Sequence, residues 1–445
     1  MVHTFNIDGR YYLFDSESGS LHICDALTSE VVKKINGEPY DLTGADDNAV
    51  KEIEEEIATL KEQGLLYVEE KREIPVKSDL VKALCLHICH DCNLSCKYCF
   101  AGKGKYKGKA EYMSFEVAKK AVDFLISNSG NRKILEMDFF GGEPLMNFDV
   151  VKKTVEYAKE EGRKAGKTFL FTLTTNGVLL NGETARWLND EMENLVLSVD
   201  GRREVHDGVR KTVNGKGSYD VIIDNIRNFV KMRGDKKYYV RGTFTNKNLD
   251  FGNDVLALAD MGLDQISLEP VVLDEKDELY IGKKDLPAIK EEYRRLSKIY
   301  LERRAKGERL FNFFHFNIDL EGGVCLKKRV SACGAGNEYF SVTPNGDIFP
   351  CHQFASNPAY KMGNVFEGKL DENIRSTFKN ASLYTREKCK DCFAKYHCSG
   401  GCAANNVNFN GDINKPYEIT CEMMKARMEC ALDIYAVKKG EKEGL

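Results

Sequence analysis

The chain has 445 residues, enough for about two to four domains that each bury a core. Its 65 basic and 69 acidic side chains give a formal net charge of -4, which argues against a protein built mainly to bind nucleic acid or anionic lipid. No run of about 18 apolar residues appears and the first ten residues lack a signal-peptide core, so we expect a cytoplasmic protein without a membrane partner.

Residues 1 to about 75 are expected to form a winged-helix-like module. The segment HTFNIDGRYYLFDSESGSLHICD holds three strand-like runs separated by turn signals at residues 8–9 and 18–19, which predicts a three-stranded meander. The segment EEKREIPVKSD is expected to be a charged linker that ends the module.

A helix is predicted within the next segment of this module, DNAVKEIEEEIATLKEQG. Gly64 is placed to end it, and its apolar residues fall on one face, namely Val50, Ile53, Ile57 and Leu60. The helix also carries several glutamates, namely Glu52, Glu54, Glu55 and Glu56. This charge has the wrong sign for binding phosphate, so we expect the module to bind a peptide and not DNA.

Residues 80 to 305 are predicted to form a parallel sheet. Six apolar, often β-branched runs alternate with segments of helical composition, and the runs are LCLHIC, ILEMDFF, FLFTLTT, NLVLSVD, YYVRGTF and QISLEPV. Alternating strands and helices predict a partial (β/α)6 version of the eight-fold TIM-like barrel, and therefore an α/β fold class.

The first four runs are each followed by a polar or glycine-rich motif. These are the segment CNLSCKYCF, then GGEP (141–144), TNG (175–177) and Asp200-Gly201. Each motif alone is usually a turn, but the C-terminal ends of parallel barrel strands meet at one rim, where active sites gather. The four motifs together therefore predict a site at this rim.

The segment CNLSCKYCF places Cys92, Cys96 and Cys99 in a C-x3-C-x2-C spacing. Fifteen cysteines in a reducing compartment indicate metal or redox chemistry, yet zinc sites and four-iron clusters both normally take four protein ligands. One alternative is a zinc knuckle that uses His90 or Cys89 as its fourth ligand. The following loop, AGKGKYKGK, matches no phosphate-binding motif and is expected to be mobile and solvated.

Residues 310 to 435 contain a second cysteine-rich region. Cys333 and Cys351 lie in a C-x12-G-x4-C pattern, and CKDCFAKYHCSGGC gives C-x2-C-x5-C-x3-C. The cysteines of the second pattern are Cys389, Cys392, Cys398 and Cys402, and Cys421 follows them. Two zinc ribbons are the alternative interpretation, but they do not explain the interleaved spacing.

The cysteine triplet with its aromatic context resembles the signature of the radical S-adenosylmethionine (radical SAM) superfamily. In that family three thiolates hold three irons of a four-iron cluster, and the fourth iron binds S-adenosylmethionine. The resemblance implies catalytic roles for Cys92, Cys96 and Cys99, and a Glu143 carboxylate that accepts from the ammonium group of S-adenosylmethionine. Its other implied cofactor-binding residues are Tyr98, Gly141, Gly142, Asn176, Ser198 and Arg210.

The third region resembles the SPASM extension of radical SAM enzymes that modify peptides. The resemblance implies two auxiliary clusters, and therefore three 4Fe-4S clusters in all. One auxiliary cluster would be held by Cys389, Cys392, Cys398 and Cys421, and the other by Cys333, Cys351 and Cys402. Cys325 is either the eighth ligand or a spare thiol beside an iron left open for a substrate thiolate, and we favour the open iron.

The whole arrangement resembles the thioether-forming maturases of SCIFF peptides, related to sactipeptide and ranthipeptide enzymes. It implies a ribosomal precursor peptide whose leader binds the N-terminal module, and an electron donor such as ferredoxin or flavodoxin. A 5′-deoxyadenosyl radical would take an α-hydrogen, and a cysteine sulfur would bond to that carbon. The alternatives are a formylglycine-forming anaerobic sulfatase maturase, another SPASM enzyme, or a non-enzymatic iron-sulfur electron carrier.

Overall fold

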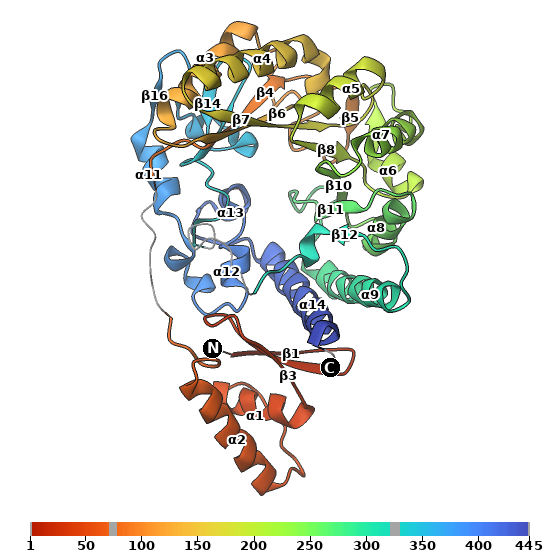
Figure 1. The fold of residues 1–445 in the computed structure, drawn as a ribbon, viewed down its shortest axis with the longest axis vertical. Helices are drawn as coiled ribbons and strands as arrows, with labels where there is room; N and C mark the ends of the chain where they lie inside the picture. Colours follow the sequence, from red (N-terminus) through yellow and green to blue (C-terminus); the bar gives the residue numbers. More distant parts are fainter. Residues whose placement is uncertain (1, 71–77, 321–329, 444–445) are drawn as a thin grey trace.

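A computed structural model describes residues 2–70, 78–320 and 330–443 of the chain (Figure 1). Cys325 and the predicted module boundary at residue 75 lie outside the described residues. Within the described ranges, no helix is both long and apolar enough to cross a membrane.

The N-terminal module (residues 2–70) contains the predicted meander and the predicted helix. Its strands form an antiparallel sheet in the order β1-β2-β3, and two helices follow: β1 (Val2–Ile7), β2 (Arg10–Asp15), β3 (Leu21–Cys24), α1 (Ala26–Asn36) and α2 (Asp47–Glu62). One side of the sheet packs with α1 and α2, through Val2, Leu13, Val31 and Ile57. The residues of its other side, including Phe5 and Tyr12, belong to the main hydrophobic core of the protein.

The six predicted barrel strands are confirmed, and all pair in parallel in chain order. They are β4 (Ala83–Cys89), β6 (Ile134–Gly141), β7 (Thr168–Thr175), β8 (Asn194–Ser198), β10 (Tyr238–Phe244) and β11 (Gln265–Pro270). The main helices are α3 (Phe115–Asn128), α4 (Phe148–Lys164), α5 (Gly182–Glu191), α6 (Arg203–Val209), α7 (Tyr219–Arg233), α8 (Phe251–Asp260) and α9 (Leu286–Ala305). Figure 1 shows the strands in an open arc with these helices on its outer side.

Short strands extend this sheet at both edges, which local sequence patterns did not predict. β12 (Asn312–Phe313) pairs in parallel with β11, and β13 (Tyr339–Val342) pairs in parallel with β4. Beyond β13 lie β14 (Asp347–Phe349), β15 (Gly363–Asn364) and β16 (Lys369–Leu370), all antiparallel. The cysteine-rich region therefore continues the barrel sheet instead of forming a detached domain.

The C-terminal region ends in a long helix. Its helices are α11 (Glu372–Asn380), α12 (Lys395–Cys398), α13 (Ala403–Asn410) and α14 (Glu418–Glu443). α14 packs against α9 of the barrel and also contacts β1 and β3 of the N-terminal module. In Figure 1 this helix lies between the barrel above and the module below, so it joins the two ends of the chain.

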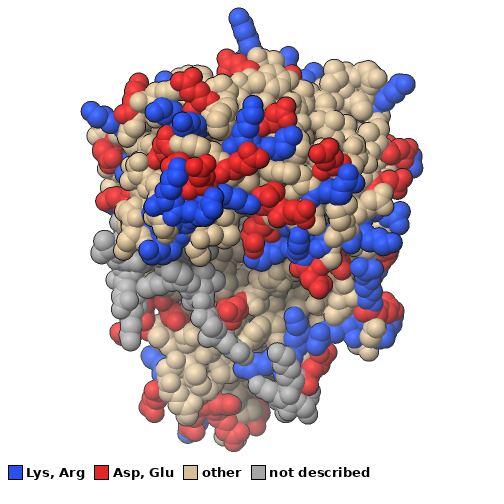
Figure 2. All heavy atoms as spheres, turned by 45° about the horizontal axis from the view of Figure 1, so that its top comes forward, with Lys and Arg blue, Asp and Glu red and all other residues tan. Residues whose placement is uncertain are grey.

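The barrel strands alternate between a buried outer side and a less buried inner side. In β6 and β7 every second residue is buried and its neighbours are half-buried, apart from an exposed first residue. Because successive strand residues point to opposite faces, the helix-covered side is a packed core and the concave side is partly open. Figure 2 shows the surface hollowed beneath a band in which basic and acidic side chains are interspersed.

Candidate radical SAM and auxiliary cluster sites

The cysteine loop (residues 90–100) is held at the barrel rim by a short two-stranded antiparallel pairing. Within it, β5 (Leu94–Cys96) pairs antiparallel with β9 (Arg210–Thr212), and Cys96 lies opposite Arg210. No local sequence pattern predicts this pairing, because its partners lie more than a hundred residues apart. It brings the predicted cofactor-binding Arg210 next to a predicted iron ligand.

The three thiols of this loop fit a positively charged ligand. Cys92, Cys96 and Cys99 are free and partly buried. Burial, with a smaller contribution from the neighbouring thiols, raises the pKa of Cys92 to about 12 and that of Cys96 to about 11, although Arg210 lowers the pKa of Cys96. Thiolates gathered in such a place need a compensating cation, which an iron cluster would supply.

Gly141 and Gly142 end β6 against the cysteine loop. The backbone N–H of Gly142 donates to the Cys89 carbonyl (2.9 Å), and that of Glu143 donates to the Asp91 carbonyl (2.9 Å). A Cβ added at Gly142 would lie 1.9 Å from the Asp91 oxygen, and one at Gly141, where φ is +121°, would lie 2.3 Å from the Cys89 oxygen. The two glycines therefore allow the end of β6 to approach the backbone of residues 89–91 closely, which a side chain at either position would prevent.

Glu143 is buried and holds two rim motifs together. Its carboxylate accepts from the Leu145 N–H (3.1 Å), the Thr175 hydroxyl (2.9 Å) and the Asn176 N–H (2.8 Å). Burial raises its pKa to about 7 despite these bonds. The Asn176 side chain in turn donates to the Asn93 oxygen (2.8 Å) and lies 3.7 Å from the Cys92 sulfur. Binding of the cofactor's ammonium group by Glu143 stays a prediction.

Tyr98 and Arg210 meet at Asp200. The Tyr98 hydroxyl donates to the Asp200 carboxylate (2.6 Å), and the Arg210 Nε lies 3.0 Å from it in an ion pair. The guanidinium also lies over the Tyr98 ring, 5.5 Å from its centre. Arg210 thus has a protein carboxylate as its partner, and its contact with the cofactor stays a prediction. Ser198 lies half-buried at the end of β8, in register with Arg241 of β10.

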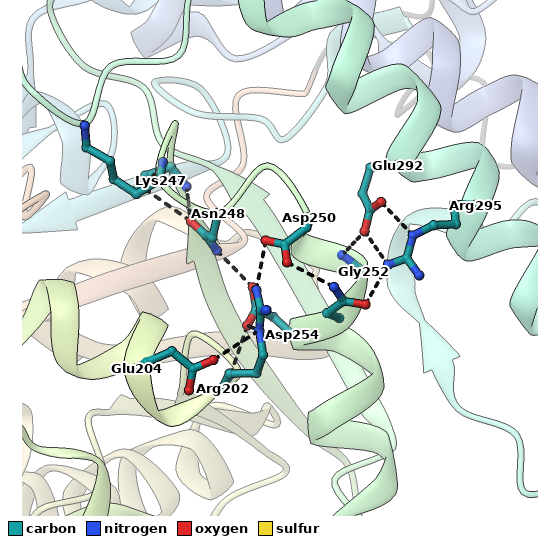
Figure 3. Close-up of polar contacts among 11 residues, drawn as sticks. Arg202, Glu204, Lys247, Asn248, Asp250, Gly252, Asp254, Glu292 and Arg295 are labelled. Atoms are coloured by element: carbon teal, nitrogen blue, oxygen red, sulfur yellow. Dashed lines mark hydrogen bonds and ion pairs between the residues drawn. The ribbon is translucent and has the colours of Figure 1, made fainter.

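A polar network behind Asp200 fixes the rim loops that follow β8 and β10 (Figure 3). Asp254 of α8 is fully buried and accepts from the Arg202 backbone (3.0 Å) and guanidinium (2.8 Å) and from Asn248 (3.0 Å). Nearby, Glu292 of α9 accepts from the backbone N–H of Gly252 (2.8 Å). Sequence analysis missed this network, because its members are ordinary polar loop residues until the fold brings them together.

The prediction of a solvated loop at AGKGKYKGK is wrong for three of its residues. Ala101, Gly104 and Tyr106 are buried, and the Tyr106 ring stacks on His90 with centroids 4.4 Å apart. A Cβ at Gly104 would lie 2.8 Å from the Cβ of Cys92, so the loop packs directly on the cysteine loop. The lysines between them remain exposed, which explains why the composition suggested full solvation.

His87 and His90 are placed as core residues. Both are buried, and His87 Nδ1 lies 3.0 Å from His90 Nε2 in a hydrogen bond. Among the described residues, no three His, Cys, Asp or Glu side chains form a site for a single metal ion. The structure therefore offers no support for the zinc knuckle at His90.

The C-terminal cysteines gather into the two predicted groups. The thiol of Cys351 lies within electrostatic reach of Cys333 and Cys402. The thiol of Cys421, on α14, lies within reach of Cys389, Cys392 and Cys398. Burial raises the pKa of Cys351 and of Cys421 to about 12, so these groups also fit positively charged iron. The assignment of individual ligands stays a prediction.

The concave side of the barrel carries a polar group that sequence analysis missed. Glu269 of β11, His315 and Arg427 of α14 are linked there by hydrogen bonds, and Arg241 of β10 lies beside them. The sequence does contain one signal for this group, because the two apolar runs YYVRGTF and QISLEPV have polar residues at alternate positions.

Comparisons with known proteins match both cysteine regions. Residues 86–248 match the Radical SAM superfamily, and residues 333–393 match the SPASM iron-sulfur cluster-binding domain. A serine-type anaerobic sulfatase-maturating enzyme of Bacteroides thetaiotaomicron is 28% identical over 366 residues, 74% of this chain and 84% of that protein. The radical SAM cyclopropyl synthase TigE of Paramaledivibacter caminithermalis is 23% identical over 362 residues, 78% of this chain and 72% of that protein.

Two solved structures share the fold. One is anSMEcpe with bound AdoMet and the Cp18Cys peptide, with TM-score 0.65 and 19% identity over 81% of this chain and 99% of that chain. The other is SuiB of Streptococcus suis bound to the precursor peptide SuiA, with TM-score 0.55 and 17% identity over 94% and 98%.

The fold, the cysteine loop and the family match at residues 86–248 together define a radical SAM domain. More particularly, the chain combines a radical SAM domain with a C-terminal SPASM domain, and these domains imply 4Fe-4S clusters and S-adenosylmethionine as cofactors.

Proposed function

We propose that this enzyme forms a thioether between a cysteine sulfur and an α-carbon of a ribosomally made, cysteine-rich precursor peptide. It holds three 4Fe-4S clusters, one on Cys92, Cys96 and Cys99 and two in the SPASM domain. The precursor peptide binds with its leader on the N-terminal module. A ferredoxin or flavodoxin donates electrons in the cytoplasm.

The main support for a peptide substrate is the docking of the N-terminal module on α14. The Arg10 guanidinium donates to both oxygens of Asp433 (2.8 and 2.9 Å), and the Tyr12 hydroxyl donates to the same carboxylate (2.6 Å). α14 also carries Cys421 and Arg427, so a leader bound to the module is held at a fixed position relative to the barrel. The SuiB structure matches 94% of this chain, whereas anSMEcpe matches only 81% of it although 99% of the anSMEcpe chain is used.

The residues of the barrel rim have separate tasks in the proposed reaction. When bound, the cluster and S-adenosylmethionine supply the radical that takes a hydrogen atom from the peptide α-carbon. Glu143 and Asn176 keep two rim loops against the cysteine loop, which orients the cofactor. The thiol proton leaves to solvent or to a base as its sulfur bonds to carbon, and the auxiliary clusters, held by the C-terminal cysteines, would supply an acceptor for the surplus electron.

The second candidate function is formylglycine formation, as in sulfatase maturation. Its support is the similarity to the Bacteroides enzyme and to anSMEcpe. That reaction oxidises the β-carbon of a single residue and leaves no crosslink. From cysteine it also replaces sulfur by oxygen, which changes the mass differently, whereas from serine it removes two hydrogens as thioether formation does, so the product must also be tested for free cysteines.

The test starts with a search beside the gene for an open reading frame of a short cysteine-rich peptide, which is then synthesised and incubated anaerobically with the reconstituted enzyme. Thioether formation lowers the peptide mass by two hydrogens, and the crosslinked cysteine then resists alkylation by iodoacetamide after reduction. Replacement of a cysteine sulfur by oxygen, or loss of two hydrogens with every cysteine still open to alkylation, indicates formylglycine instead. An unchanged peptide, with S-adenosylmethionine cleaved, rejects both functions for this substrate.

A further inference from the structure

Arg241 occupies the middle of the concave barrel side. It lies on β10 in register with Ser198 of β8 and Ser267 of β11, so the three side chains share one face of the sheet. Its side chain is exposed and makes no hydrogen bond or ion pair with any residue in the described ranges. An arginine pointing into a barrel without a partner is unusual, because a guanidinium carries five donors in a fixed plane.

The neighbouring carboxylate is already engaged. Glu269 accepts from Arg427 Nη1 (3.3 Å) and lies 3.8 Å from His315 Nε2. Arg427 Nη1 also donates to His315 Nδ1 (2.9 Å). The charge of Arg241 acts on Glu269 only at longer range. Glu269 thus serves Arg427 and His315, and Arg241 remains without a hydrogen-bonding anion.

The charges of this group leave an excess of positive charge. A guanidinium can only donate, so His315 Nδ1 is the acceptor and its imidazole is neutral. Burial lowers the pKa of His315 to about 3, in agreement with a neutral ring. Within this group two guanidiniums therefore face one carboxylate, and the second guanidinium, Arg427, also lies within electrostatic reach of Cys398. An anion bound at Arg241 would balance the charge, and a carboxylate matches the guanidinium fork with two parallel hydrogen bonds.

We propose that Arg241 binds a carboxylate of the peptide substrate, either an aspartate or glutamate side chain or the C-terminal carboxylate, next to the reacting residue. This inference rests on the proposed function and adds a preference for a carboxylate to its substrate class. It makes Arg241 a specificity residue that positions the peptide and takes no part in forming the radical.

The position of Arg241 separates it from the cofactor's own carboxylate. Asn176, which lies against Cys92, follows β7, and Arg241 lies two strands further along the sheet on β10. Adjacent strands are about 4.8 Å apart, so the two positions are separated by roughly 10 Å. This gap leaves room for the reacting part of a peptide between the cofactor and the guanidinium.

The test compares Arg241→Gln and Arg241→Lys with the exposed control Arg186→Gln in the reconstituted full-length enzyme. The probe is the synthetic cysteine-rich precursor peptide used to test the proposed function, with each acidic residue changed in turn to its amide and, separately, with an amidated C-terminus. In Arg241→Gln we expect unchanged S-adenosylmethionine cleavage without peptide, and a KM for the parent peptide raised about tenfold or more. One neutralised peptide should show the same raised KM with the wild type and with Arg241→Gln, and Arg241→Lys should restore part of the affinity.

Each other result overturns the inference in a recognisable way. Loss of cofactor cleavage without peptide in Arg241→Gln assigns the arginine to the cofactor's carboxylate. A KM effect of equal size for every peptide, or no effect, excludes carboxylate recognition. If the wild type modifies none of the peptides, the proposed function itself fails.

Discussion

Cys92, Cys96 and Cys99 are the residues on which the radical chemistry rests. Changing all three to Ala should abolish S-adenosylmethionine cleavage and lower the iron content by about four atoms per chain, because each cluster has its own thiolates. Iron analysis and assay of 5′-deoxyadenosine measure the two effects. Cys24→Ala, on β3 of the N-terminal module, is the matched control and should change neither. Normal cleavage in the triple variant would disprove the assignment.

Glu143 matters for the shape of the site whether or not it touches the cofactor. In Glu143→Ala, three buried donors on Leu145, Thr175 and Asn176 lose their acceptor. We expect the free energy of unfolding to fall by about 1–3 kcal/mol and cofactor cleavage to slow. Thermal denaturation and the 5′-deoxyadenosine assay measure this, with exposed Glu275→Ala as the control. An unchanged melting temperature would show that these bonds contribute little.

At the scale of single residues, the sequence predicted which residues meet at the barrel rim but not which side chains they bind. Motif spacing placed Gly142, Glu143 and Asn176 at one rim, and the structure brings them together there. The motif spacing did not predict that Asp200 neutralises Arg210, or that the Arg241 side chain has no hydrogen-bonding partner on the concave side. Such contacts depend on strand register, which a single sequence leaves open.

The attachment of β1 and β2 to α14 is the element-scale feature that the sequence did not reveal. Asp433 is 1% exposed and carries the bonds from Arg10 and Tyr12. Asp433→Ala should lower the free energy of unfolding by about 1–3 kcal/mol, because both partners lose a charged acceptor. Lys298→Ala, which breaks an exposed 3.9 Å pair between α9 and Asp8 of the module, should have almost no effect. Equal melting temperatures for the two variants would contradict this account.

β3 is an edge strand of the described module sheet and the expected place for the leader to add as a strand. Ile23 on this strand is 66% exposed. Ile23→Asp should weaken binding of the precursor peptide while leaving the melting temperature and uncoupled cofactor cleavage unchanged. Fluorescence anisotropy with the labelled peptide measures the affinity, with the equally exposed Val213→Asp as the control. Unaltered affinity would move the leader site elsewhere.

The long elements were predictable and the short ones were not. Six barrel strands of five to eight residues carry their own apolar signal. β12 and β15 have two residues each, and β13 pairs with β4 across about 250 positions of chain. Pairing over that distance is set by the packing of the whole molecule, so no local pattern records it.

At the scale of the whole molecule, α14 connects the three predicted parts. It packs on α9 of the barrel, carries Cys421 of the SPASM region and holds the N-terminal sheet through Asp433. Deleting the module would remove Phe5 and Tyr12 from the main core and expose the residues that pack against them. Point variants on β3 therefore test the function of the module more cleanly than truncation.

The most direct test of the central claim follows a deuterium atom from the peptide to the cofactor product. The synthetic cysteine-rich precursor peptide is prepared with deuterium on the α-carbons of candidate acceptor residues and incubated anaerobically with the enzyme. The 5′-deoxyadenosine that forms is analysed by mass spectrometry. The account predicts deuterium in 5′-deoxyadenosine, together with a peptide that has lost the same atom and gained a thioether. Unlabelled 5′-deoxyadenosine beside a modified peptide that keeps its α-deuterium would contradict it.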